Sequence, residues 1–178
     1  MAIQRIAVLG AGQMGNGITQ VAAAAGYDVI MIDIEQEYVD KGLATIQRSL
    51  GKLVSKERMS QEDADATLAR ISLATDRNVC ADCDLVVEAV PEILDLKTSI
   101  FAELDGICKP ETILASNTSS ISISTIADAT NRPDRVIGMH FMNPVPIMKL
   151  VEVINGDKTS SETNAAVIEA SAKMGKTA

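Results

Sequence analysis

The sequence predicts an α/β fold in which a doubly wound, mostly parallel sheet carries helices on both faces. Short apolar runs alternate along the chain with longer segments of helical periodicity, the pattern typical of parallel strands joined by helices. One of these runs stops at a cluster of glycines and is followed by an alanine-rich segment. A length of 178 residues with 47% hydrophobic content suits one well-packed domain and is short for two.

The glycine cluster lies between an apolar run at residues 3–9 and a helix-prone segment. Gly10 would allow a sharp turn out of the strand, Gly12 would let a pyrophosphate approach the backbone, and Gly15 would let the helix pack closely on the sheet. The helix N-terminus offers free N–H groups and a partial positive charge, which favour phosphate binding. The turn therefore predicts a Rossmann-type dinucleotide site, whereas the alternative is a tight turn without a ligand.

Asp33 ends the second apolar run, about 20 residues after the glycine cluster, where dinucleotide-binding folds place an acidic residue. A carboxylate at this point accepts hydrogen bonds from both hydroxyls of the adenosine ribose. Its charge would repel a 2′-phosphate, so the sequence favours NAD over NADP.

Charge and hydropathy exclude several classes of partner. The net charge of −8 argues against nucleic acid and anionic membranes, which need a basic surface. No apolar run reaches the roughly 20 residues that cross a bilayer. Because the N-terminus enters a strand without a basic segment and signal-peptide core, we expect a cytoplasmic location.

Three cysteines, an odd number, suit a reducing compartment better than a disulfide framework. Cys80 and Cys83 form a C-x-x-C pair, but further zinc ligands at finger spacing do not accompany them. We therefore expect no metal, and redox or zinc chemistry is a distant alternative.

After Asp33, residues 35–55 have helical periodicity, and Ser60 followed by acidic residues predicts a second helix that runs through Ala69. A short strand is expected at residues 71–74. The polar face of the first helix reads as a solvated surface and carries Lys41, Arg48, Ser49, Lys52 and Lys56.

Residues 84–90 form an apolar run typical of a parallel strand buried on both faces. Its carboxyl end is polar, with Glu88 and Glu92, and in open α/β sheets that end faces the ligand. The next helix is expected at residues 93–104, with Lys97 away from its apolar side. A strand at residues 112–115 follows and leads into the small polar residues 116–120, which either cap a helix at 121–129 or line a site.

His140, the single histidine, follows a predicted strand at residues 135–139 and precedes a proline-restricted loop. A strand at 149–154 carries Glu152, and a helix is expected at 161–174. A lone histidine is more often structural than catalytic. Its place at the ligand-facing end of a strand nevertheless favours catalysis, with Glu152 orienting the ring and raising its basicity if the two strands are neighbours.

Four motifs occur in order: GAGQMG, DLVVEAVPE, ASNTSS and HFMNPVPIMKLVEV. With these motifs the chain resembles the NAD-binding domain of the 3-hydroxyacyl-CoA dehydrogenases, and within that family the bacterial 3-hydroxybutyryl-CoA dehydrogenases. The resemblance covers essentially the whole chain, and its last two motifs are much more specific than the glycine turn.

The resemblance implies a role for each matching residue. His140 corresponds to the catalytic acid and base, Glu152 to its partner, and Ser119 to the serine that contacts substrate and nicotinamide. Ser49 and Lys56 correspond to candidate contacts for coenzyme A, on a helix that has no sharp motif. The cofactor-site positions are Gly10, Gly12, Gln13, Met14, Gly15, Asp33, Glu92, Lys97, Asn117, Ser119 and Asn143.

The implied reaction is the reversible, NAD-dependent oxidation of an (S)-3-hydroxyacyl-CoA to the 3-oxoacyl-CoA in fatty acid or butanoate metabolism. Family members continue into a helical C-terminal domain that supplies an active-site asparagine and most of the dimer interface. This chain ends before that domain, so we expect residues 1–178 to be one NAD-binding domain of a longer, homo-oligomeric protein. By itself this domain is expected to keep the NAD site but to have impaired or no turnover. The alternative is an NAD-binding module without chemistry, which would have no need of His140 and Glu152.

Overall fold

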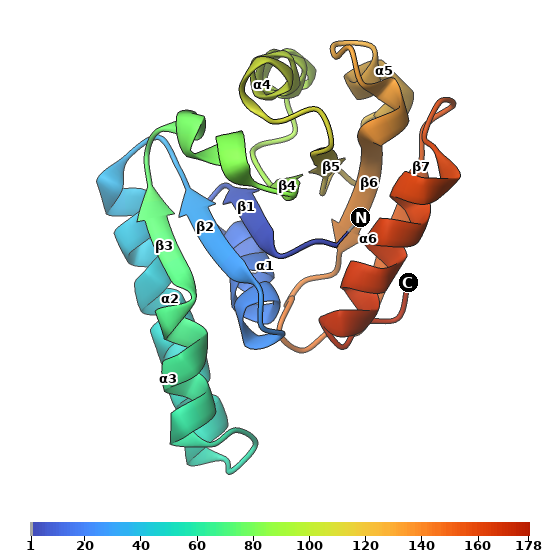
Figure 1. Ribbon diagram of the computed structural model, residues 1–178. Helices are drawn as coiled ribbons and strands as arrows, with labels where there is room; N and C mark the ends of the chain where they lie inside the picture. The colour runs from blue at the N-terminus through green and yellow to red at the C-terminus, as the bar shows by residue number, and fades with distance from the viewer. Residues whose placement is uncertain (1) are drawn as a thin grey trace.

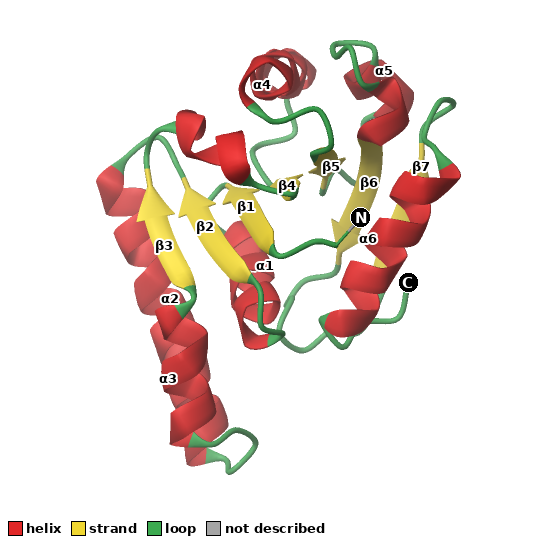
Figure 2. Cartoon of the chain, in the orientation of Figure 1, coloured by secondary structure: helices red, strands yellow, loops and turns green. Residues whose placement is uncertain are grey.

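The chain forms a seven-stranded sheet in the order β3-β2-β1-β4-β5-β6-β7 (Figures 1 and 2). The architecture is given by a computed structural model that describes residues 2–178. The strands are β1 (Arg5–Leu9), β2 (Asp28–Ile32), β3 (Ile71–Ala74), β4 (Leu85–Glu88), β5 (Ile113–Ser116), β6 (Val136–Phe141) and β7 (Val151–Asn155). The chain order reverses between β1 and β4, and this is the point at which open α/β sheets form their ligand crevice.

Six strands are parallel, and β7 alone runs antiparallel to its neighbour β6. In the central pairs, Ile6 of β1 lies opposite Val29 of β2 and Leu85 of β4. At the edge, the antiparallel register places His140 of β6 opposite Glu152 of β7. The prediction of a doubly wound, mostly parallel sheet is confirmed.

Helices cover both faces of this sheet. The α-helices are α1 (Gln13–Ala24), α2 (Gln36–Ser55), α3 (Gln61–Ala69), α4 (Leu94–Ile107), α5 (Ile123–Ala127) and α6 (Ser161–Lys173). Residues of α1 and α6 pack with Ile6 and Val8 of β1, whereas residues of α4 and α5 pack in the cluster that holds Ala7 and Leu9. Figure 1 shows α4 and α5 across the sheet from α1. Successive side chains of β1 point to opposite faces of the sheet, so this strand contributes to one hydrophobic core on each face.

Several boundaries differ from the predicted ones. Strand β6 continues to Phe141, so His140 lies inside the strand and not after it. Helix α5 is shorter than predicted and is capped by Ser122, whose hydroxyl accepts a hydrogen bond from the N–H of Thr125. The alternative in which residues 116–120 cap this helix is therefore wrong. Two short 3₁₀ helices, η1 (Arg77–Asp82) and η2 (Pro133–Arg135), were not predicted because segments this short carry no periodic signal.

The three cysteines are free and lie buried in the core beside α4. Burial raises the pKa of the Cys80 thiol, and the neighbouring Cys83 adds to this effect. Burial also raises the pKa of Cys108, to about 11. Among residues 2–178, no group of three or more histidine, cysteine or acidic side chains is arranged to hold a metal ion. Within the same residues, no helix combines the length and the apolar character needed to cross a membrane.

Candidate active site

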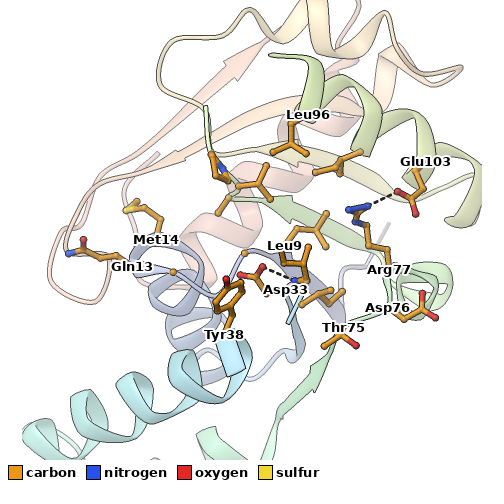
Figure 3. A pocket seen from close by; sticks show the side chains of 18 residues that line it. Leu9, Gln13, Met14, Asp33, Tyr38, Thr75, Asp76, Arg77, Leu96 and Glu103 are labelled. Carbon is orange, nitrogen blue, oxygen red and sulfur yellow. Dashed lines mark hydrogen bonds and ion pairs between the residues drawn. The ribbon is translucent and has the colours of Figure 1, made fainter. Parts of the chain in front are cut away.

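Two adjoining cavities open at the carboxyl ends of the parallel strands. The larger one, of about 860 Å³, runs past the glycine turn, Asp33 and the start of η1, and we call it the large cavity (Figure 3). The second, of about 300 Å³, reaches His140 and is called the small cavity. Both are lined by Met14 and by residues that follow β4, namely Ala89, Val90 and Pro91. An elongated ligand can therefore extend from one cavity into the other.

The three glycines of the turn have different roles. Gly10 has a φ angle of +109°, and a Cβ atom placed there would lie 2.5 Å from the carbonyl oxygen of Ala89. A Cβ atom at Gly15 would lie 1.8 Å from the carbonyl oxygen of Gly10. At Gly12, in contrast, no protein atom lies within 4 Å of the added Cβ atom. Packing therefore requires glycine at positions 10 and 15, whereas Gly12 keeps open a space beside the N-terminus of α1.

Asp33 is fixed at the edge of the large cavity by two backbone groups. Its Oδ2 accepts a hydrogen bond from the N–H of Ala11 at 2.9 Å, and its Oδ1 accepts one from the N–H of Ile34 at 2.8 Å. The first bond connects the end of β2 to the glycine turn. An anchored carboxylate beside an uncapped helix N-terminus and an open glycine fits the ribose and pyrophosphate of a dinucleotide.

His140 and Glu152 face one another across the antiparallel pair β6 and β7. The Nδ1 atom of His140 lies 3.2 Å from Oε1 of Glu152, and their side chains are 21% and 53% exposed. An ionised carboxylate can only accept a hydrogen bond, so in the neutral imidazole this contact favours the tautomer with the proton on Nδ1 and the lone pair on Nε2. The pair can therefore take up a proton at Nε2 and stabilise the resulting charge.

The small cavity brings together several of the residues that the resemblance assigns to the catalytic and cofactor sites. Asn117 accepts a hydrogen bond from the N–H of Phe141 through Oδ1 at 2.8 Å. Asn143 accepts one from Nε2 of Gln13 at 3.1 Å, which connects the loop after β6 to the glycine turn. The predicted residues that line this cavity are Met14, Glu92, Lys97, Asn117, Ser119, His140 and Asn143.

A buried ionic network underlies the small cavity, and its centre is Glu88, which the sequence predicted only as part of the polar end of a strand. Lys97 is buried. Its ammonium group lies 2.6 Å from Oε2 of Glu88 and 2.9 Å from Oε1 of Glu92. Ser116 donates a hydrogen bond to Oε1 of Glu88 at 2.6 Å. The available signals were a charged residue inside an apolar strand and a lysine in the following helix.

Glu92 connects this network to the surface of the cavity. Thr118 donates a hydrogen bond to its Oε2 at 2.6 Å, and Ser120 donates a second at 3.1 Å. Partial burial raises the pKa of Glu92, but the hydrogen bonds from Thr118, Lys97 and Ser120 and the charge of Lys97 outweigh it and lower the pKa to about 2. The side chain is therefore an anion throughout the neutral range.

The two candidate contacts for coenzyme A lie apart from both cavities. Ser49 is on α2 and Lys56 is its C-cap residue, and neither lines the large or the small cavity. A third cavity, of about 550 Å³, lies between the glycine turn and α2 and is lined by Lys41 and Thr45. Since Thr45 and Ser49 are one helical turn apart, Ser49 continues the face of α2 that borders this cavity.

Comparisons with known proteins match nearly the whole chain. The family model described as "3-hydroxyacyl-CoA dehydrogenase, NAD binding domain" matches residues 5–178. A probable 3-hydroxybutyryl-CoA dehydrogenase of Deinococcus radiodurans is 53% identical over 97% of this chain and 62% of its own length. A 3-hydroxybutyryl-CoA dehydrogenase of Bradyrhizobium diazoefficiens is 49% identical over 98% of this chain and 59% of its own length. The chain thus spans about 60% of the length of these relatives.

Solved structures agree with these matches. A 3-hydroxybutyryl-CoA dehydrogenase from Escherichia coli superposes with a TM-score of 0.98 at 41% identity, over 99% of this chain and 38% of that one. An (S)-3-hydroxybutyryl-CoA dehydrogenase from Ralstonia eutropha gives a TM-score of 0.97 at 47% identity, over 99% of this chain and 62% of that one.

Proposed function

Because this chain belongs to the 3-hydroxyacyl-CoA dehydrogenase family through its NAD-binding domain, we propose that the protein interconverts (S)-3-hydroxyacyl-CoA and 3-oxoacyl-CoA. The cofactor of this family's domain is NAD, and the open space at Gly12 beside the anchored Asp33 fits it. The preferred substrate we propose is 3-hydroxybutanoyl-CoA, since that acyl group recurs in the names of the relatives. The single observation that carries the proposal is the His140–Glu152 pair beside the small cavity.

In this reaction the side chains of the protein carry out the proton transfer. NAD bound along the two cavities would supply the acceptor for the hydride of C3 of the hydroxyacyl group. His140 takes the proton of the 3-hydroxyl group at Nε2, and the carboxylate of Glu152 stabilises the imidazolium through Nδ1. In the reverse direction His140 returns the proton to the oxygen of the 3-oxo group. We propose that Ser119, which lines the same cavity, donates a hydrogen bond to that oxygen.

The proposed site for coenzyme A is the exposed face of α2. Lys41 and Thr45 line the third cavity, and Ser49 and Lys56 follow them along the helix and at its C-cap. Lysine and hydroxyl groups in this arrangement suit the phosphates of the nucleotide portion. This assignment rests on the resemblance and on the position of the cavity.

A second candidate function is a dinucleotide-binding domain without turnover of its own. It is favoured by the contrast between the two cavities, because the large one has a volume of about 860 Å³ and the small one only about 300 Å³. Glu152 is also 53% exposed, which weakens its electrostatic effect on His140.

We also propose a cytoplasmic homo-oligomer. The free, buried cysteines suit a reducing compartment. Exposed apolar side chains after β6, namely Ile147, Met148 and Leu150, offer a surface for subunit contact.

The test is a calorimetric titration with NADH, followed by an assay of acetoacetyl-CoA-dependent loss of NADH absorbance on the same sample. The dehydrogenase function predicts NADH binding and turnover, with turnover abolished and binding retained in His140→Ala. Binding without turnover in the unmodified chain would favour the second candidate. Absence of NADH binding by the folded protein would contradict both.

A further inference from the structure

An ion pair lies at one end of the large cavity and has no role in the chemistry described above. Arg77, the first residue of η1, places Nη1 2.6 Å from Oε2 of Glu103 on α4. Both residues line the cavity, with side chains that are 28% and 48% exposed. Figure 3 shows the pair on one side of Asp33 and the side chains of Gln13 and Met14 on the other.

The position of the pair relative to the small cavity identifies the part of the dinucleotide that it meets. Met14 lines both cavities, so the nicotinamide end extends past it toward His140. Asp33 is the ribose-binding carboxylate in the proposed function, on which this inference rests. The remaining portion beyond Asp33, on the side of Arg77, is the adenine.

The walls at this end suit a flat aromatic base. Leu96, Ile100 and Glu103 recur at the spacing of one helix face, so α4 presents two apolar side chains and then the carboxylate to the cavity. Ile34, which is 70% exposed, also lines the large cavity and gains burial when a base covers it. A planar guanidinium group stacks on such a base, an interaction that an ammonium group does not reproduce.

We infer that Arg77 is a cofactor-binding residue that stacks on the adenine of NAD, and that Glu103 is the positioning residue that holds its guanidinium plane in the cavity. The carboxylate of the adjacent Asp76 has other partners, because its Oδ1 accepts hydrogen bonds from the backbone and the side chain of Asn78, each at 2.9 Å. The ion pair with Glu103 and the charge of Asp33 leave this end unsuited to a 2′-phosphate. Stacking, and not phosphate recognition, is therefore the role of Arg77.

The experiment compares three probes on the 178-residue chain: NADH, ADP-ribose, and reduced nicotinamide mononucleotide, which lacks the adenosine. Arg77→Ala is expected to weaken NADH and ADP-ribose binding about tenfold and to leave the mononucleotide unchanged. Arg77→Lys should recover little of this loss, because lysine restores the positive charge but not the planar group that stacks on the base. Glu103→Gln should weaken NADH binding about threefold. The matched control is Arg58→Ala, which removes an exposed arginine outside both cavities.

Unchanged NADH binding in Arg77→Ala would overturn the inference while leaving the proposed function intact. Equal weakening of all three probes would also overturn it, because the substitution would then have damaged the site as a whole. Full recovery in Arg77→Lys, or a selective loss of NADPH binding in Arg77→Ala, would assign the arginine to charge recognition of a phosphate instead. Failure of the unmodified chain to bind NADH or ADP-ribose would reject the proposed function itself.

Discussion

The ammonium nitrogen of Lys97 lies 2.6 Å from Oε2 of Glu88, and their side chains are 1% and 0% exposed. Two opposite charges this deep in the protein are tolerated because each has further partners. Glu88 also accepts hydrogen bonds from Ser116 and from the N–H of Val90, and Lys97 also reaches Glu92. The pair therefore connects the buried end of β4 to the wall of the small cavity, where it holds Glu92 in place.

Replacing Lys97 by methionine should destabilise the fold by about 3–5 kcal/mol, because Glu88 would remain as a buried charge without its partner. The measurement is urea denaturation of the variant and of the unmodified chain. The matched control is the double variant Glu88→Gln/Lys97→Met, which removes both charges and should recover much of the loss. A single variant within about 1 kcal/mol of the unmodified chain would show that Glu88 finds another partner or a proton.

Glu92 should make stability depend on pH in the acid range. Its pKa is lowered from 4.5 to about 2 in the folded protein, so its contribution is complete above pH 4.5 and is lost as the pH falls toward 2. Glu92→Gln removes this contribution, and its stability should fall less steeply with acidification over that window. Denaturation midpoints measured between pH 5 and pH 2.5 test this, with the exposed Glu111→Gln as control. Parallel pH profiles of Glu92→Gln and the unmodified chain would contradict the role assigned to the network.

The parts that could be predicted from the sequence depend on local rules. The glycine turn, its flanking strand and helix, and Asp33 follow one another closely in the chain, so their geometry is set by short-range sterics and spacing. The sequence predicts His140 at the end of one strand and Glu152 within a later one, and the antiparallel register of β6 and β7 confirms that these strands are neighbours.

The parts that were missed depend on how distant elements pack. Glu88 meets Lys97 only because α4 returns over β4, and Arg77 meets Glu103 only because a short 3₁₀ helix lies against the same α4. Side-chain periodicity places a residue on a face, but it does not identify the partner that a second element brings to it. Lys97 is an example: its periodicity predicts a place away from the apolar side of its helix, but the residue is buried because Glu88 of β4 pairs with it.

Gly12 and Gly15 offer a matched pair that separates binding from folding. Gly15→Ala places a Cβ atom 1.8 Å from the carbonyl oxygen of Gly10 and should destabilise the fold by about 3 kcal/mol or more. Gly12→Ala meets no protein atom within 4 Å, and its stability should stay within about 1 kcal/mol of the unmodified chain. NADH affinity should nevertheless fall at least about tenfold in Gly12→Ala, because the methyl group enters the space left for the pyrophosphate. Thermal unfolding and NADH titration of both variants would show this, and full NADH affinity in Gly12→Ala would place the pyrophosphate elsewhere.

Glu152→Gln tests whether the carboxylate beside His140 contributes charge or only a hydrogen bond. Glutamine keeps an oxygen that can accept from Nδ1, which lies 3.2 Å from the present carboxylate oxygen, but it removes the negative charge that stabilises the imidazolium. Because Glu152 is 53% exposed, solvent weakens this charge, and we expect kcat to fall about ten- to a hundredfold. His140→Ala should lose more, about a hundred- to ten-thousandfold, because the proton acceptor itself is gone. The affinity for NADH should change little in both variants, since the glycine turn and Asp33, which hold the pyrophosphate and ribose in the proposed function, are left intact. A Glu152→Gln variant with full kcat would show that His140 acts without this carboxylate, and a rise in the NADH dissociation constant would instead give the pair a role in cofactor binding.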